Sequence, residues 1–251
     1  MIIVCALKME ASPLIEYYKL SGVKTSFQCY SNEKSGVFLI ISGVGKVRSA
    51  VATAFALNYN HDGFIVNFGF CGCSPVQDTG ILVIANKITD FDTKKSYYPD
   101  ILFEHNMEEV ELVCVPHVQK KPVGFIDMES SGFYQAAVSF VKSHETAVIK
   151  LTSDHGGKMP SDMSKGYDRL FNQLDNLKNY FKREDPTGID FFEELKNVCR
   201  FTVTMVNNIK KLTKGYCLKN GTNALPNIKL YNPKDKNERQ KLYNEICKAL
   251  Y

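Results

Sequence analysis

The stretch FIVNFGFCG, residues 64–72, joins a run of large apolar residues to two closely spaced glycines. Phenylalanine, isoleucine and valine favour β-strands, and a continuous apolar run is typical of a strand that is buried on both faces. Glycines at the end of such a run mark a place where the backbone turns tightly or where another group approaches it closely. The stretch therefore predicts a central strand that is followed by a glycine loop.

Six further apolar runs are predicted strands. They span residues 2–7, 37–43, 81–88, 110–115, 123–128 and 147–153. Helix candidates lie between them: residues 46–60 carry apolar side chains on more than one face, and apolar side chains recur at helical spacing within residues 130–143. This alternation predicts an α/β fold with a central mixed, partly parallel sheet flanked by helices.

The composition and the hydrophobic pattern of the sequence change after Asp154. Residues 158–185 are polar, with apolar side chains at spacings of three and four, and helical patterns follow over residues 190–212 and 237–251. We therefore expect a single α/β domain over residues 1–251, with a helical insertion at 158–187 and a C-terminal extension at 214–251.

The charge of the chain is nearly balanced. Its 251 residues contain 31 Lys and Arg and 27 Asp and Glu, a net charge of +4, with both signs interspersed. This pattern does not indicate a nucleic-acid partner. No apolar run approaches the roughly 20 residues of a membrane span, and Lys8 interrupts the apolar N-terminus too early for a signal peptide. We expect no membrane partner.

The eight cysteines are scattered along a chain without an export signal. This usage indicates free thiols in a reducing compartment, so we expect a cytoplasmic protein. Cys71 and Cys73 could bind a metal only with further ligands, and none stands at a familiar zinc spacing. We therefore expect no metal.

The stretch SGVGKVRS, residues 42–49, has two glycines and a lysine in a pattern similar to that of a phosphate-binding turn. A Walker loop needs four residues between its first glycine and Gly-Lys, and a hydroxyl directly after the lysine; neither holds here. The dinucleotide fingerprint also fails, because Arg48 stands where its third glycine would be. The residues alone leave two interpretations open: a tight strand-to-helix turn, or a turn that binds a ligand.

Five segments follow one another along the chain in a recognisable order. They are ALKMEASPLI (6–15), SGVGKVRSAVATAFAL (42–57), IVNFGFCGCSPVQDTGILVIANKITDFD (65–92), VGFIDMESSGFYQAA (123–137) and AVIKLTSDHGG (147–157). Together they resemble the nucleosidase and nucleoside phosphorylase superfamily, most closely the nucleosidases that cleave methylthioadenosine and S-adenosylhomocysteine. The resemblance covers roughly residues 1–157 and the helix expected after Gly188, in the sense of a motif match.

The resemblance implies a set of site residues. Breaking an N-ribosidic bond requires a proton donor for the departing base and a nucleophile for the sugar. By resemblance, Asp154 is the general acid, Ser153 helps to hold it, and Glu10 orients and deprotonates water. Glu129 binds the ribose hydroxyls, and Met128 lies against the sugar. The resemblance also places five further residues near the substrate: Asp127, Phe70, Cys71, Gly72 and Met9.

Structural interpretations of the same residues remain open. Ser153 and Asp154 could cap a helix or shape a turn, as these residue types often do after a strand. Glu10 could be an exposed residue that opens a helix. Glu129 is harder to explain in this way, because a carboxylate at the end of an apolar strand is costly to bury without a partner.

The resemblance implies a cofactor-independent homodimer that hydrolyses a purine nucleoside, a 5′-modified adenosine such as methylthioadenosine or S-adenosylhomocysteine. Asn67 stands where the phosphorylases carry a phosphate-binding arginine, which favours water as the nucleophile. Phe70 replaces a small hydroxyl residue, and the segment that stacks on adenine has no equivalent around residues 110–125. Two alternatives stay open: a phosphate-dependent phosphorylase, and a catalytically idle protein that binds nucleosides.

Overall fold

A computed structural model of the chain describes residues 1–59, 64–156, 163–181, 195, 198–202, 204–206, 208–209, 212–213, 216 and 228–250. These residues belong to two compact units, Met1–Phe181 and Lys182–Tyr251. Each unit has apolar side chains that cluster with one another. The structure thus differs from the expectation of one domain over residues 1–251, because the apolar side chains described beyond Phe181 form a core of their own.

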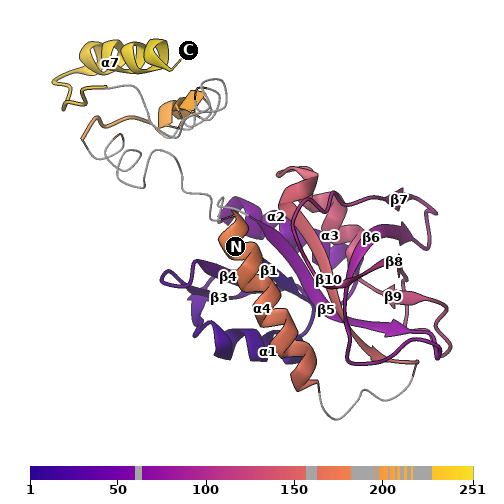
Figure 1. Cartoon of the computed structure of the whole chain (residues 1–251). Helices are drawn as coiled ribbons and strands as arrows, with labels where there is room; N and C mark the ends of the chain where they lie inside the picture. Colours follow the sequence, from indigo (N-terminus) through magenta and orange to yellow (C-terminus); the bar gives the residue numbers. More distant parts are fainter. Residues whose placement is uncertain are drawn as a thin grey trace. The chain divides into compact units, whose positions relative to one another are not determined.

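The first unit is built on a mixed sheet of ten strands (Figure 1). The strands are β1 Ile2–Cys5, β2 Ser21–Lys24, β3 Gln28–Asn32, β4 Val37–Ile41, β5 Ile65–Cys73, β6 Leu82–Asp90, β7 Ser96–Tyr97, β8 Glu108–Cys114, β9 Phe125–Asp127 and β10 Thr146–Asp154. Parallel pairing joins β4, β1, β5 and β10, and a second parallel group comprises β6, β8 and β9. All seven predicted strands are confirmed.

Five of these strands close into a ring. β5 pairs with β10, β10 with β6, β6 with β8 and β8 with β9, and β9 returns to pair with the end of β5. β5 also pairs with β1, which leads outward through β4 and β3 to β2. The apolar run at residues 64–72 therefore forms the strand that joins the ring to β1, β4, β3 and β2, while β7 pairs with β6 of the ring.

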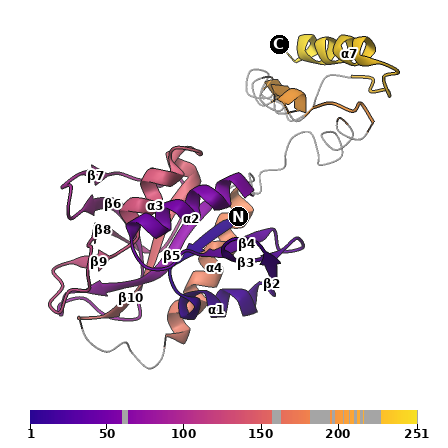
Figure 2. The same cartoon turned by 180° about the vertical axis from the view of Figure 1, so that it is seen from behind.

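Helices cover both faces of the sheet (Figures 1 and 2). The first face is covered by α1 Lys8–Tyr17 and α4 Ser164–Phe181, and the second by α2 Lys46–Tyr59 and α3 Ser130–Ala137. Side chains along β1 and β4 alternate between the two cores, so Ile2 packs with α2 and α3 while Ile3 packs with α1 and α4. A short 3-10 helix, η1 Ser143–Glu145, leads into β10. The predicted α/β architecture is confirmed.

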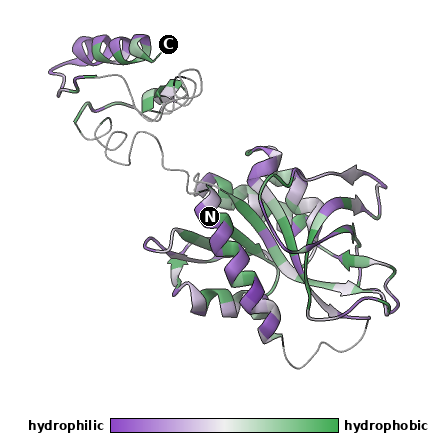
Figure 3. Ribbon diagram, in the orientation of Figure 1, coloured by the Kyte–Doolittle hydropathy of each residue, from purple (hydrophilic) through white to green (hydrophobic). Residues whose placement is uncertain are grey.

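Helix α4 lies within the segment that the sequence marked as an insertion, residues 158–187. Its apolar stripe, Tyr167, Leu170, Leu174 and Leu177, is buried in the core of the first unit. In Figure 3, the strands at the centre of the unit are largely hydrophobic (green), whereas α4 also carries broad hydrophilic bands (purple). The helix is therefore part of the first unit, because its apolar stripe covers one face of the sheet.

The second unit contains α7 Lys236–Ala249, which confirms the predicted C-terminal helix. Asp235 caps α7: its side chain accepts hydrogen bonds from the backbone of Asn237 and Glu238. Leu242 and Ile246 turn inward to pack with Leu195 and other buried residues. The helix expected over residues 190–212 lies largely outside the described residues. Within the described part of the chain, no helix has the length and apolar character needed to cross a membrane.

Candidate active site

Glu10 is buried at the start of α1. Its side chain is anchored by three backbone N–H groups: Ala6 and Leu7 donate to Oε2 at 3.0 and 2.8 Å, and Phe70 donates to Oε1 at 2.9 Å. Burial raises the pKa of the Glu10 carboxyl above its usual range, although these hydrogen bonds and the charge of Lys150 oppose the shift. The interpretation of Glu10 as an exposed residue is therefore wrong: its carboxylate is held in a fixed orientation inside the protein.

Gly69 makes room for this carboxylate. A Cβ atom at position 69 would lie 2.9 Å from Glu10 Oε1, closer than ordinary van der Waals contact. Gly69 pairs with Lys150 on the neighbouring strand β10. The glycine of the apolar run therefore allows Glu10 to lie against the backbone of β5, close to a buried lysine.

Lys150 is the residue of this site that the sequence analysis missed. Its Nζ lies 2.9 Å from Asp127 Oδ2, and the two side chains are 1% and 0% exposed. Burial alone would lower the pKa of Lys150, but Asp127, Glu129 and Glu10 together raise it well above its usual range. A lysine in the middle of the run AVIKLTS was the available signal, because a charge is buried in a strand only beside a partner.

Glu129 precedes α3 and meets the glycine turn. The backbone N–H of Gly45, directly before α2, donates to Glu129 Oε1 at 2.8 Å. Burial raises the pKa of Glu129, which Lys150 opposes and Asp127 reinforces. A helix start favours an anion. The turn that looks like a phosphate cradle in the sequence thus holds a carboxylate of the protein itself.

Ser153 and Asp154 end β10 beside the end of β5. Asp154 pairs with Gly72, and Ser153 Oγ lies 2.6 Å from Asp154 Oδ2 and 3.1 Å from the carbonyl oxygen of Cys71. The N–H of Gly156 donates to Asp154 Oδ1 at 2.7 Å. Asp154 therefore shapes the turn after β10, as one structural interpretation expected, while its carboxyl is held near the residues of β5.

The remaining predicted residues differ in exposure. Met128 and Gly72 are partly exposed, and Phe70 is partly buried against Tyr167 of α4, with ring centroids 6.5 Å apart. Met9 points outward, with 54% of its surface exposed. The Cys71 side chain is buried in the core, where burial raises the pKa of its thiol. The carbonyl oxygen of Cys71 accepts a hydrogen bond from Ser153.

The strand β5 brings the candidate residues together. Glu10 is bound at Gly69 and Phe70, while Ser153 and Asp154 lie beside Cys71 and Gly72. Ile126, directly before Asp127, also pairs with Gly72. Two carboxyl groups and a buried ion pair are thus anchored within a few residues of one strand.

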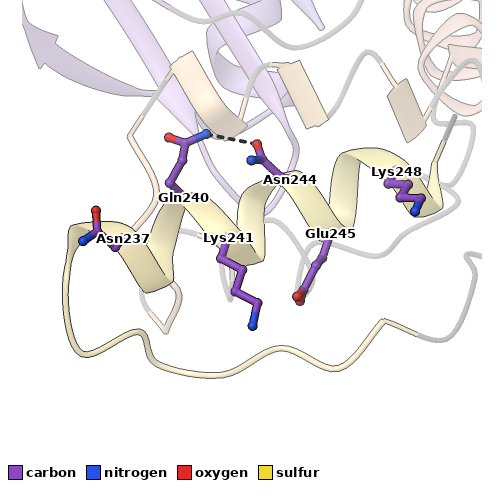
Figure 4. Close-up of a pocket in the computed structure, with 6 residues that line it drawn as sticks. All are labelled: Asn237, Gln240, Lys241, Asn244, Glu245 and Lys248. Atoms are coloured by element: carbon purple, nitrogen blue, oxygen red, sulfur yellow. Dashed lines mark hydrogen bonds between the residues drawn. The ribbon is translucent and has the colours of Figure 1, made fainter.

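Two further observations concern possible sites elsewhere in the described residues. No three His, Cys, Asp or Glu side chains in the described ranges come together as metal ligands. A shallow hollow along α7 in the second unit is lined by Asn237, Gln240, Lys241, Asn244, Glu245 and Lys248 (Figure 4). None of these residues was predicted to act in the site.

The comparisons with known proteins concern the fold. No protein-family model matches the sequence, and no curated protein matches it. Among solved structures, an Arabidopsis thaliana 5′-methylthioadenosine nucleosidase in apo form is similar, with a TM-score of 0.60 and 16% identity over 71% of this chain and 94% of that one.

Two bacterial structures are similar to the same extent. The 5′-methylthioadenosine/S-adenosylhomocysteine nucleosidase of Neisseria meningitidis, in complex with methylthio-immucillin-A, has a TM-score of 0.54 and 18% identity over 70% of this chain and 91% of its own. The S-adenosylhomocysteine nucleosidase of Streptococcus pyogenes, in complex with 5-methylthiotubericidin, has a TM-score of 0.54 and 18% identity over 71% and 92%. The chain thus has the nucleoside phosphorylase-like fold of these nucleosidases.

Proposed function

We propose that this protein hydrolyses the N-ribosidic bond of a purine nucleoside and releases the free base. The observation that carries the proposal is the anchoring of Glu10 at Phe70 and of Asp154 beside Gly72, two residues further along β5, with Glu129 bound to the glycine turn. Two carboxyl groups that flank a sugar suit a reaction that needs a base on one side and an acid on the other.

Glu10 is the proposed general base. Its three backbone hydrogen bonds hold both oxygens in place: Oε2 accepts two of them, whereas Oε1 accepts one and can accept a further hydrogen bond from a water molecule. The raised pKa brings its basicity closer to that needed to accept a proton near neutral pH. The ionised carboxylate would then orient and deprotonate the attacking water.

Asp154 is the proposed general acid. Ser153 Oγ carries one proton and lies within hydrogen-bonding distance of two oxygens, Asp154 Oδ2 and the Cys71 carbonyl. The Ser153 hydroxyl can donate its proton to either acceptor, and the N–H of Gly156 donates to Asp154 Oδ1, so both oxygens of the Asp154 carboxyl have a fixed neighbour. This arrangement supports an acid that gives its proton to the purine as the bond breaks.

Glu129 and Met128 are the proposed sugar contacts. Glu129 would accept hydrogen bonds from the ribose hydroxyls while Gly45 holds its other side. The partly exposed Met128 would cover the sugar with an apolar side chain.

Water is the proposed nucleophile rather than phosphate. Asn67, at the position where the phosphorylases carry an arginine, is buried, and its side-chain nitrogen donates to the carbonyl of Val4 at 3.1 Å. The buried cation Lys150 already faces Asp127. Neither residue offers an unpaired cation that would neutralise a phosphate dianion.

The finer assignment is a 5′-modified adenosine such as methylthioadenosine or S-adenosylhomocysteine. It rests on the sequence motifs and on the ligands named for the similar structures, methylthio-immucillin-A and 5-methylthiotubericidin. The proposed enzyme is cytoplasmic and works as a homodimer. Exposed valines in the glycine turn and the first two turns of α2, namely Val44, Val47 and Val51, support a subunit contact, and the described cysteines are all free thiols.

The test is base release from a panel of nucleosides, each with and without phosphate: methylthioadenosine, S-adenosylhomocysteine, 5′-deoxyadenosine, adenosine and inosine. We expect phosphate-independent release, fastest with a 5′-thio substrate. Release that strictly requires phosphate would indicate a phosphorylase, and no release would indicate an idle nucleoside-binding protein. Sedimentation velocity of the same sample tests the homodimer.

A further inference from the structure

The start of α3 is held by carboxylates from two strands. Asp90 ends β6 and Asp127 ends β9, and both pair with Cys114 of the intervening strand β8. Asp127 accepts hydrogen bonds from the N–H and the hydroxyl of Ser130, at 2.9 and 2.6 Å. Asp90 Oδ2 accepts a hydrogen bond from Ser131 Oγ at 2.7 Å. The first turn of α3, directly after Glu129, is therefore attached to the sheet at two points.

Asp90 also binds the start of α2. Lys46 Nζ lies 3.2 and 3.1 Å from the two oxygens of Asp90 and 2.6 Å from Asp92 Oδ2. The side chain of Asp90 is 2% exposed, whereas that of Asp92 is 45% exposed. Burial alone would raise the pKa of Asp90, but hydrogen bonds from Thr93, Ser131 and Lys46 lower it well below its usual range. Asp90 is thus a buried anion that bridges two helix starts.

The two helix starts meet at a contact that tolerates no side chain. A Cβ atom on Gly132 would lie 1.9 Å from the carbonyl oxygen of Lys46. The residues just before each helix are joined as well, through the 2.8 Å hydrogen bond from Gly45 N to Glu129 Oε1. A change in the spacing of α2 and α3 would therefore move Gly45 relative to the Glu129 carboxylate.

We propose that Asp90 is a positioning residue for Glu129: it binds Lys46 and Ser131 together, fixes the spacing of the two helix starts, and so keeps the Gly45 N–H on the Glu129 carboxylate. The consequence for ribose recognition rests on the proposed function, in which the other side of Glu129 accepts hydrogen bonds from the ribose hydroxyls. Asp90 acts through its neighbours and does not touch the substrate.

The first test compares matched substrates that differ in one ribose hydroxyl. Adenosine is set against 2′-deoxyadenosine, and inosine against 2′-deoxyinosine, for the wild type and for the variants Asp90→Asn and Ser131→Ala. We expect kcat/KM for the ribonucleoside to fall roughly tenfold, about the effect of one hydrogen bond to a charged group, and to fall less for the deoxy substrate. The control is Asp92→Asn, which removes the exposed partner of Lys46 and should leave the ratio unchanged. A general loss of folded protein would lower both substrates equally, so an unchanged ratio in both variants would overturn the proposal.

The second test does not require activity. Amide hydrogen exchange measured by NMR reports the Gly45 N–H directly, and we expect faster exchange in Asp90→Asn and Ser131→Ala than in the wild type or in Asp92→Asn. Equal exchange at Gly45 in all four proteins would refute the positioning role. A wild type that releases no base from any nucleoside would defeat the proposed function, while the exchange rates would still decide whether Asp90 holds this contact.

Discussion

Lys150 Nζ lies 2.9 Å from Asp127 Oδ2, and neither side chain reaches the solvent. This ion pair joins β10 to β9 within the ring of strands, and Asp127 in turn holds Ser130 at the start of α3. A buried charge without its partner is strongly destabilising. The pair therefore connects the stability of the ring to the position of the carboxylates around it.

Replacing Lys150 tests this connection. We expect Lys150→Met to lower the free energy of unfolding by about 3–5 kcal/mol, because Asp127 is left buried and unpaired. Denaturant unfolding monitored by circular dichroism gives the value. The control is Lys87→Met, which breaks the exposed Lys87–Glu111 pair, 2.9 Å long, and should lower the free energy of unfolding far less. Similar losses in both variants would contradict the account of the buried pair.

Glu10→Gln should abolish base release while leaving the fold intact. A glutamine has nearly the same shape, but it cannot accept the proton of water, so we expect a loss of about 100- to 10,000-fold in kcat. Glu16→Gln, on an exposed residue of the same helix, is the control and should retain full activity. Normal turnover by a folded Glu10→Gln variant would remove Glu10 from the mechanism.

Gly69→Ala should disturb the same carboxylate without changing its chemistry. The added Cβ would meet Glu10 Oε1 at 2.9 Å, and a small displacement of a catalytic group can cost about 100-fold in rate. Gly22→Ala is the matched control, since a Cβ at that position in β2 has no atom within 4 Å. Equal activity of the two variants would show that Glu10 does not need its present place on β5.

Asp154→Asn should distinguish proton donation from substrate binding. We expect purine nucleoside hydrolysis to fall about 100- to 10,000-fold, because the departing base no longer receives a proton. A 4-nitrophenyl riboside has a leaving group that needs no protonation, so its hydrolysis should be largely preserved. Asp168→Asn, on the exposed side of α4, serves as the control. Parallel loss of both reactions would argue that Asp154 is not the general acid.

The pH dependence of kcat/KM should reflect the burial of Glu10. The base must be ionised, so activity is present above its pKa and is lost as the pH falls through that pKa. Because burial raises the pKa of Glu10, this loss should begin at a higher pH than for an ordinary glutamate, whose pKa is about 4.3. An acid limb at or below the ordinary glutamate value would count against Glu10 as the base.

The sequence predicted the interior of the fold better than its margins. The strands at residues 64–70 and 147–153 were predicted because continuous β-branched and aromatic runs are buried on both faces. The edge strand β2 was missed: Ser21, Gly22 and Lys24 are exposed and show no alternation. Pro13 lies inside α1, where it weakens the helical pattern.

The candidate site, like the fold, was predicted only in part from the sequence. The resemblance of short motifs predicted Glu10, Glu129 and Asp154 as site residues, and the fold places them along β5 and beside the glycine turn. The run AVIKLTS contains the lysine, but neither its pairing with Asp127 nor the hydrogen bond from the Gly45 N–H to Glu129 could be predicted from local patterns, because each contact joins segments that are far apart in the chain. Spacing in the sequence describes one element at a time, whereas the pKa of a buried carboxyl depends on what other elements bring to it.

The closed ring of β5, β10, β6, β8 and β9 determines which strands of the first unit can unfold locally. A strand in a ring has neighbours on both sides, so it cannot detach without breaking two ladders of hydrogen bonds at once. Amide protons at the centres of β5 and β10 should therefore exchange only when the whole unit unfolds, while β2, which pairs on one side only, frays first. Local motions that let a ligand enter or leave then occur in the segments that connect the strands, and the strand ends that carry the carboxyl groups remain fixed.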